Sequence, residues 1–123
     1  MTAYWLLLIS FAGTLSMPAI SDTPHCTLHI LQDATDSLHR YQLALECKET
    51  GGHIRYELQV TRKGKSGTSQ AGQSGTTMID SDHLLLGNVK INLQAADTVL
   101  VTGMVRDADE QIIAEAFQEF SVQ

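Results

Sequence analysis

The stretch "HIRYELQVT", from His53 to Thr61, alternates between apolar and polar side chains without a break. Successive side chains of a β-strand point to opposite faces of the sheet, so strict alternation is typical of a strand that buries one face. The predicted buried face carries Ile54, Tyr56, Leu58 and Val60, and the predicted outer face carries Arg55, Glu57, Gln59 and Thr61. The stretch therefore predicts a half-buried strand, which needs a second layer of structure to cover its apolar side.

Six other runs of the chain also have strand-like patterns. They are 25–31, 40–47, 75–79, 84–93, 97–107 and 111–122, and turn-forming sequences such as "TGG", "DSD" and "RDADEQ" separate several of them. No helical spacing long enough to predict a helix follows residue 21. Seven short strands within about 100 residues predict an all-β fold, namely an immunoglobulin-like seven-stranded β-sandwich.

Three of these runs carry more detailed predictions. The apolar face of 84–93 is expected to hold Leu85, Val89, Ile91 and Leu93. The run 97–107 is apolar on both sides, which favours a central strand. The apolar residues of 111–122 fit no single period, which predicts a β-bulge near the start of that strand.

The two cysteines are predicted to face each other across a hairpin. In "HCTLHIL" Cys26 shares a face with Ile30, and in "RYQLALEC" Cys47 shares a face with Leu43. If the two runs pair as antiparallel strands, the register that opposes Ile30 and Leu43 also opposes Cys26 and Cys47. A disulfide between directly opposed strand residues is geometrically possible, and the alternative is a pair of buried, reduced thiols.

The first 21 residues differ in composition from the rest of the chain. "MTAYWLLLISFAGTLSMPAIS" has no charged side chain and ends in a small-x-small pattern that a signal peptidase accepts. We expect residues 1–21 to be a secretory signal peptide and 22–123 to form one domain in the periplasm, free of the membrane after cleavage. The alternative is an uncleaved anchor, although the apolar run is shorter than the roughly 20 residues of a spanning helix.

Composition and charge exclude several classes of function. The formal net charge of −6 over 123 residues disfavours nucleic acid as a partner, because phosphate binding needs a basic face. The five histidines are scattered, and no serine stands beside an evident base, so neither a metal site nor a catalytic site is predicted. We therefore expect a protein that is not an enzyme and has no cofactor.

The segment "TRKGKSGTSQAGQSGTTM", from Thr61 to Met78, begins at the end of the predicted strand 53–61. It has three basic residues, followed by a long polar tract. Its position between strands indicates a long hairpin turn rather than a flexible linker. Residues 55–65 carry four positive charges and one negative charge, that of Glu57, whereas residues 106–119 are acidic. The four cations are Arg55, Arg62, Lys63 and Lys65. Such a dipolar surface can steer a partner, or the cations can simply protect a strand edge from aggregation.

The sequence "RKGKSGTSQAGQSG", residues 62–75, resembles a segment of the periplasmic curli accessory chaperones, the CsgC and CsgH group. The resemblance continues through "LGNVKINLQAADTVLVTGMVRD", residues 86–107, and covers the chain from Cys26 to its end. It implies a monomeric chaperone that inhibits premature amyloid polymerisation of a secreted curli-type fibre subunit. The separated cysteines differ from the Cys-x-Cys motif of the enterobacterial branch, which removes any basis for a redox role.

The resemblance also implies a surface that binds an acidic client by charge and by polar hydrogen-bonding groups. The candidate client-binding residues are Arg55, Arg62, Lys63, Lys65, Ser66, Ser69, Gln70, Gln73 and Lys90. One alternative is that the polar tract is only a turn, with the client bound elsewhere. Another is that the chain is an immunoglobulin-like adhesion or pilus accessory module, because fold does not determine function.

Overall fold

The computed structural model describes residues 26–123, and all regular structure in this part of the chain is β-strand. The strands are β1 (Cys26–Thr35), β2 (Leu38–Cys47), β3 (His53–Gly64), β4 (Gly67–Met78), β5 (His83–Asn92), β6 (Thr98–Asp107) and β7 (Ile112–Ser121). The predicted all-β architecture with seven strands is confirmed. The expected signal peptide, 1–21, lies outside the described residues. No helix that could cross a membrane occurs between residues 26 and 123.

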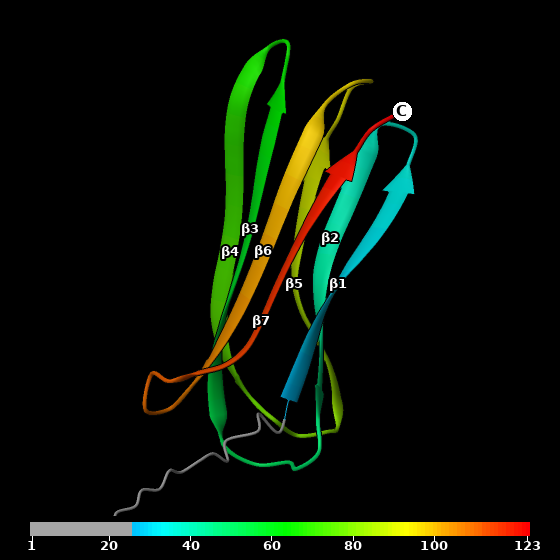
Figure 1. Ribbon diagram of the computed structural model, residues 1–123. Helices are drawn as coiled ribbons and strands as arrows, with labels where there is room; N and C mark the ends of the chain where they lie inside the picture. Colours follow the sequence, from blue (N-terminus) through cyan, green and yellow to red (C-terminus); the bar gives the residue numbers. More distant parts are fainter. Residues whose placement is uncertain (1–25) are drawn as a thin grey trace, which may run out of the picture.

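The strands form two antiparallel sheets that pack face to face (Figure 1). One sheet has the order β1-β2-β5 and the other has the order β4-β3-β6-β7. In the constant-type immunoglobulin domain the fourth strand lies in the sheet of the first, second and fifth strands. Here β4 pairs along its whole length with β3. The fold is therefore a three-on-four β-sandwich whose strand order differs from that of the constant-type immunoglobulin domain.

The core lies between the inner faces of the two sheets. Its largest fully buried side chains are Tyr41, Leu43, Leu45, Leu58, Val60, Val99, Val101 and Val105. The Tyr41 hydroxyl accepts a hydrogen bond of 2.9 Å from Gln32 Nε2, and its ring lies 5.4 Å from that of Phe120. Burial raises the pKa of the Tyr41 hydroxyl, while the Gln32 hydrogen bond opposes that shift. The polar end of Tyr41 is thus satisfied at the margin of the core.

A β-bulge in β5 reverses the face that its side chains occupy. The pairing of β2 with β5 shifts between Tyr41 and Leu43, opposite Gly87, which has a φ of 77°. Leu86 is buried before the bulge and Val89 is buried after it. The prediction that Leu85 faces the core is wrong, because the bulge shifts the alternation by one residue and leaves Leu85 62% exposed.

The other two predictions about individual strands are confirmed. The strand β6 lies between β3 and β7, as its two apolar sides indicate. The pairing of β6 with β7 shifts where Val105 lies opposite Ala114 and Arg106 lies opposite Ile112. Ile113 is the extra residue, so a bulge stands at the start of β7.

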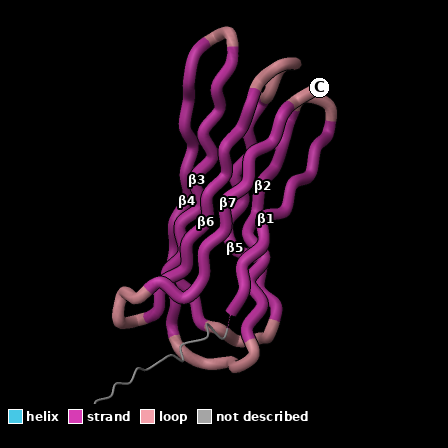
Figure 2. Tube along the Cα trace, viewed as in Figure 1, coloured by secondary structure: helices cyan, strands magenta, loops and turns pink. Residues whose placement is uncertain are grey.

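The polar tract forms a strand and not a long turn. Residues Gly67–Met78 pair with β3 in unbroken register, and only Lys65 and Ser66 form the turn between the two strands. The predicted long hairpin turn is therefore wrong. Figure 2 shows the two strands running together to the end of the molecule. The hydrogen bonds of the ladder compensate for the low strand propensity of the tract, which is rich in glycine and serine.

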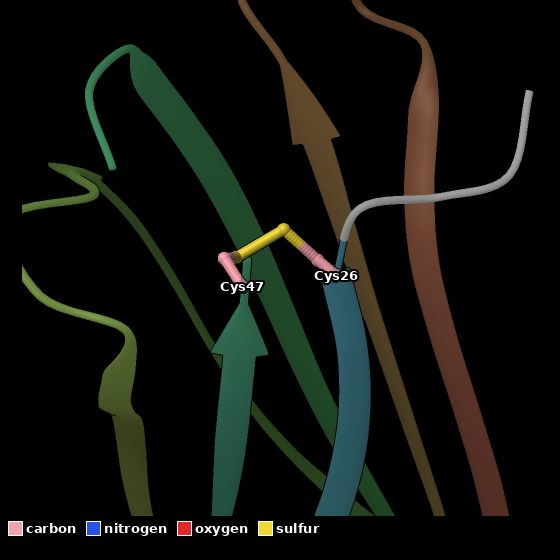
Figure 3. The surroundings of a disulfide bond; sticks show 2 residues. All are labelled: Cys26 and Cys47. Carbon is pink, nitrogen blue, oxygen red and sulfur yellow. A yellow bond between two sulfur atoms is a disulfide. The ribbon is translucent and has the colours of Figure 1, made fainter. Parts of the chain in front are cut away.

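The predicted hairpin register and the disulfide are confirmed. Ile30 lies opposite Leu43 and Cys26 lies opposite Cys47, with the cysteine Cα atoms 4.0 Å apart. Figure 3 shows the Cys26–Cys47 disulfide joining the start of β1 to the end of β2. The backbone N–H of Cys47 donates to Asp82 on the other side of β2, which matches the closer, non-hydrogen-bonded kind of cross-strand pair.

Candidate functional site

The candidate client-binding residues lie mainly on β3, on β4 and on the turn that joins these strands. Side chains of β3 alternate between the core and the outer face, with Leu58 and Val60 buried and Gln59 exposed. We define the β3–β4 face as the outward-pointing residues of these two strands. They are Arg55, Glu57, Gln59, Thr61 and Lys63 on β3, and Thr68, Gln70, Gly72, Ser74 and Thr76 on β4.

Arg62 does not belong to this face. Its Nε donates to Ser69 Oγ at 3.0 Å, its Nη1 donates to Ser66 Oγ at 3.2 Å, and Nη1 lies 3.6 Å from Asp97 Oδ2. The side chain of Arg62 is only 16% exposed, and that of Asp97 is 3% exposed. Arg62 and Ser69 are therefore parts of a partly buried polar cluster that ties the β3–β4 hairpin to the loop before β6, and the exposed Ser66 contacts this cluster from the turn.

Asp97 packs closely against the backbone of the β3–β4 hairpin at Gly64. Its Oδ2 also accepts a hydrogen bond of 2.9 Å from the backbone N–H of Gln94. A Cβ atom at Gly64 would lie 1.9 Å from Asp97 Oδ1, so glycine is required there by close approach. Arg62 was expected among the cations of the steering surface, but its side chain is largely buried. Arg62 lies two positions after Val60 and four after Leu58, on the side of β3 that points inward. The alternation of the strand could therefore have predicted that Arg62 points inward.

Lys63 and Lys65 are the exposed cations at the end of the hairpin. Both residues are exposed, and neither forms an ion pair with any residue in the described part of the chain. Lys63 lies opposite Thr68, and Lys65 is in the turn itself. Together they place two uncompensated positive charges beside an uncharged strand.

Arg55 lies at the other end of β3. Lys63 lies eight positions further along the strand, which corresponds to about 26 Å in an extended chain. Its Nη2 lies 2.7 Å from Glu110 Oε1 in the acidic β6–β7 turn, which also holds Asp109 and directly follows Asp107 at the end of β6. Figure 1 shows the β6–β7 turn and the β3–β4 turn at opposite ends of the sandwich. Arg55 and Lys63 thus do not form one patch, although they are close in sequence.

Lys90 lies on the other sheet. It is exposed on β5 and lies opposite Arg40 of β2. The Arg40 guanidinium pairs with Asp33, so one of the two cations there is compensated. Lys90 is therefore separated from the β3–β4 face by the thickness of the sandwich, because the outer sides of two packed sheets point in opposite directions.

The two glutamines of the candidate set have different environments. Gln70 is on the β3–β4 face, where its Nε2 donates to Thr61 Oγ1 at 3.4 Å. Gln73 lies opposite the buried Leu58 and accepts a hydrogen bond from the backbone N–H of Asn88. Gln70 is thus available to a partner at the surface, whereas Gln73 joins β4 to the bulge of β5.

An exposed apolar site on the same sheet was not predicted from the sequence. Phe117 on β7 is 69% exposed and lies opposite Thr102. A hollow of about 530 Å³ lies beside it, lined also by Met104 and by the acidic side chains Glu57 and Glu115. The position of Phe117 between two outward glutamates, Glu115 and Glu119, was the sequence signal that could have identified it. No cluster of His, Cys, Asp or Glu within residues 26–123 is arranged to hold a metal ion.

No protein-family model matches the chain, and a comparison with curated proteins finds no match. Among solved structures, the solution structure of R. palustris CsgH superposes with a TM-score of 0.59 and 16% sequence identity, over 78% of this chain and 91% of that chain. The E. coli curli protein CsgC superposes with a TM-score of 0.58 and 15% identity, over 77% of this chain and 97% of that chain. The chain therefore has the fold of CsgH and CsgC.

Proposed function

We propose that this chain is a periplasmic chaperone that delays the amyloid polymerisation of a curli-type fibre subunit by transient, electrostatically guided binding. One observation carries the proposal. On a chain with a net charge of −6, Lys63 and Lys65 stand exposed and unpaired, within the described residues, at the end of a long uncharged strand. The fold shared with the curli protein CsgC supports the choice of client, and the composition of residues 1–21 supports export.

The physical mechanism follows from the separation of charge. Positive charge at the β3–β4 turn attracts an acidic client and orients it, since the acidic β6–β7 turn lies at the other end of the sandwich. Outward hydroxyl and amide groups such as those of Thr68 and Gln70 then offer hydrogen bonds to a polar segment. Amyloid growth depends on few ordered nuclei, so transient capture of early strands lengthens the lag at low stoichiometry.

The variant Lys63→Glu/Lys65→Glu tests this electrostatic mechanism. We expect it to need about ten-fold more protein than the wild type for the same delay of fibril formation, because reversing both charges removes the steering. Both side chains are exposed, so stability should change by about 0.5 kcal/mol or less per site. The measurement is dye-monitored fibrillation of a purified curli-type subunit. Salt should weaken wild-type inhibition in the same way, because exposed charges are screened beyond about 8 Å at physiological ionic strength.

A matched control has the same change in net charge at the opposite end of the molecule. Lys48→Glu/Arg55→Glu alters two exposed cations near the acidic end and should retain most of the inhibition. Equal loss in both variants would show that net charge, and not the β3–β4 turn, sets the interaction. Equal inhibition by wild type and Lys63→Glu/Lys65→Glu at all salt concentrations would exclude the turn as the steering surface.

A further inference from the structure

The four edge strands of the sandwich differ in how they are protected against pairing with another chain. Native edges are blunted by charged side chains, proline or bulges, because an open edge is a template for strand addition. The edge strand β1 carries Asp33, β5 has the bulge at Gly87 and Lys90, and β7 has the bulge at Ile113 with Glu115. The edge strand β4, Gly67–Met78, has no charged residue, no proline and no bulge along its 12 residues.

The hydrogen-bond pattern shows which backbone groups of β4 are free. The residues of an antiparallel pair that exchange hydrogen bonds alternate with residues that do not. Directly after β4, the N–H of Ile79 donates to the carbonyl of Gly52 at 3.0 Å. This bond determines which of the alternating residues of β4 form hydrogen bonds with β3. Every second residue before Ile79 therefore bonds to β3, and the residues between them direct N–H and C=O groups away from it. These outward residues are Thr68, Gln70, Gly72, Ser74 and Thr76.

The free edge is open to solvent. All five outward residues are exposed. The neighbouring sheet approaches β4 from its inner side, where Gln73 bonds to Asn88 of β5. A continuous row of backbone donors and acceptors is thus accessible over about 26 Å, from Thr68 to Thr76.

We propose that the free edge of β4 binds an extended polar segment of the fibre subunit, with acidic residues only near its end, as an additional antiparallel strand. This inference rests on the proposed function for the identity of the client. Backbone hydrogen bonds supply the binding, as in other cases of strand addition. Gln70, with Ser74 and Thr76 on the same side, presents amide and hydroxyl groups to matching side chains of the incoming strand, which is rich in Gln, Asn, Ser or Gly.

Charge favours a client over a second copy of this chain. Lys63 and Lys65 flank one end of the edge, so an incoming strand with an acidic residue at that end gains a favourable interaction. The strand β4 itself has no acidic side chain to offer to these lysines in a second copy. The occupant is therefore a polar strand with acidic residues near its end, and self-pairing is one outcome of the test.

Hydrogen exchange of the backbone amides tests the inference without any substitution. The probe is a synthetic peptide of Ser, Gln and Gly with Asp at both ends, added to the disulfide-bonded protein. We expect exchange at Gln70, Gly72 and Ser74 to slow by about ten-fold at saturation, because new hydrogen bonds form there. Exchange at Ser69 and Ala71 should change little, since their amides already bond to β3. Uniform protection, or none on β4, would overturn the inference.

A proline at an outward position tests the same edge in the fibrillation assay. Ser74→Pro removes an N–H that does not bond to β3, so the fold tolerates it as edge strands tolerate proline. We expect this variant to need about ten-fold more protein for the same delay, because one client carbonyl loses its donor. The matched variant Ser74→Ala keeps the N–H and loses only the hydroxyl, so it should retain most of the inhibition. Neither variant changes the charge of the Lys63 and Lys65 turn.

The outcomes separate this inference from the proposed function. If the wild type and Ser74→Pro delay fibrils equally, the chaperone function stands and strand addition at β4 is wrong. If the wild type does not delay fibrils, the proposed function fails, while exchange with the peptide still decides whether the edge adds a strand. Protection of Gln70 and Ser74 that rises with protein concentration in the absence of peptide would assign the edge to a second copy and overturn the proposed occupant.

Discussion

Replacing both cysteines with serine should lower the free energy of unfolding by about 3 kcal/mol. The disulfide joins Cys26 and Cys47, which are 21 residues apart, and in the chain-entropy model closing a loop of this length removes that much conformational freedom from the unfolded state. It also holds the start of the edge strand β1 against β2. Urea unfolding of the wild type and of Cys26→Ser/Cys47→Ser measures the difference, with a lower midpoint and a somewhat steeper slope in the variant, because its unfolded chain is less compact and exposes more surface.

Two controls accompany this measurement. Intact-mass analysis after alkylation should detect two thiols in the wild type only after reduction. The wild type in reductant should match the stability of the serine variant, because both lack the cross-link. A loss below about 1 kcal/mol, or two cysteines that react freely before reduction, would contradict the assigned role of the disulfide.

Arg62→Met should cost about 3 kcal/mol of stability. The substitution keeps much of the volume of the side chain but leaves Asp97 buried without its cation, and removing one partner of a buried pair is more costly than losing the pair. Ser66 and Ser69 lose their donor as well. The control is Lys63→Met, which changes the next residue on the exposed face and should cost about 0.5 kcal/mol or less.

The double variant Arg62→Met/Asp97→Asn makes this prediction specific. Removing the charge of Asp97 should recover part of the loss, since the uncompensated charge is its main cause. Equal stability of Arg62→Met and Lys63→Met would contradict the internal role of Arg62. In that case Arg62 would return to the set of surface residues available for a client.

Strand positions and the register of the first hairpin were predictable from the sequence, because half-buried strands repeat every two residues. The alternation through Ile30 and Leu43 fixed the opposition of Cys26 and Cys47, and the structure has the same pairing. The bulge at Gly87 could not be located in this way. A bulge inserts one residue into the alternation, so the pattern before it and the pattern after it each look regular, and Leu85 was assigned to the wrong face.

The polar tract shows the limit of composition. Gly67–Met78 has little strand propensity and no apolar face, and a turn was the natural prediction. Its strand conformation comes from pairing with β3, whose own pattern is strong. Local sequence does not contain that tertiary contribution, because strand propensity depends on the neighbouring strand.

The candidate site was predictable only in part for a related reason. Closeness in sequence placed Arg55 with Lys63, but an extended strand separates them by about 26 Å. The alternation of side chains along β3, extended to the end of the strand, would have predicted that Arg62 points inward and Lys63 outward. The position of Lys90 depends on which sheet contains β5, and the free edge of β4 depends on strand order. Neither can be deduced from the spacing of residues along one strand.

The lag time of fibril formation tests the central claim most directly. A purified curli-type subunit is followed by dye fluorescence, alone and with the disulfide-bonded protein well below equimolar concentration. We predict a longer lag that grows with protein concentration, because capture of a few early strands is enough to delay nucleation. An unchanged lag at every concentration would contradict the chaperone function and would favour an adhesion or pilus accessory module on the same fold.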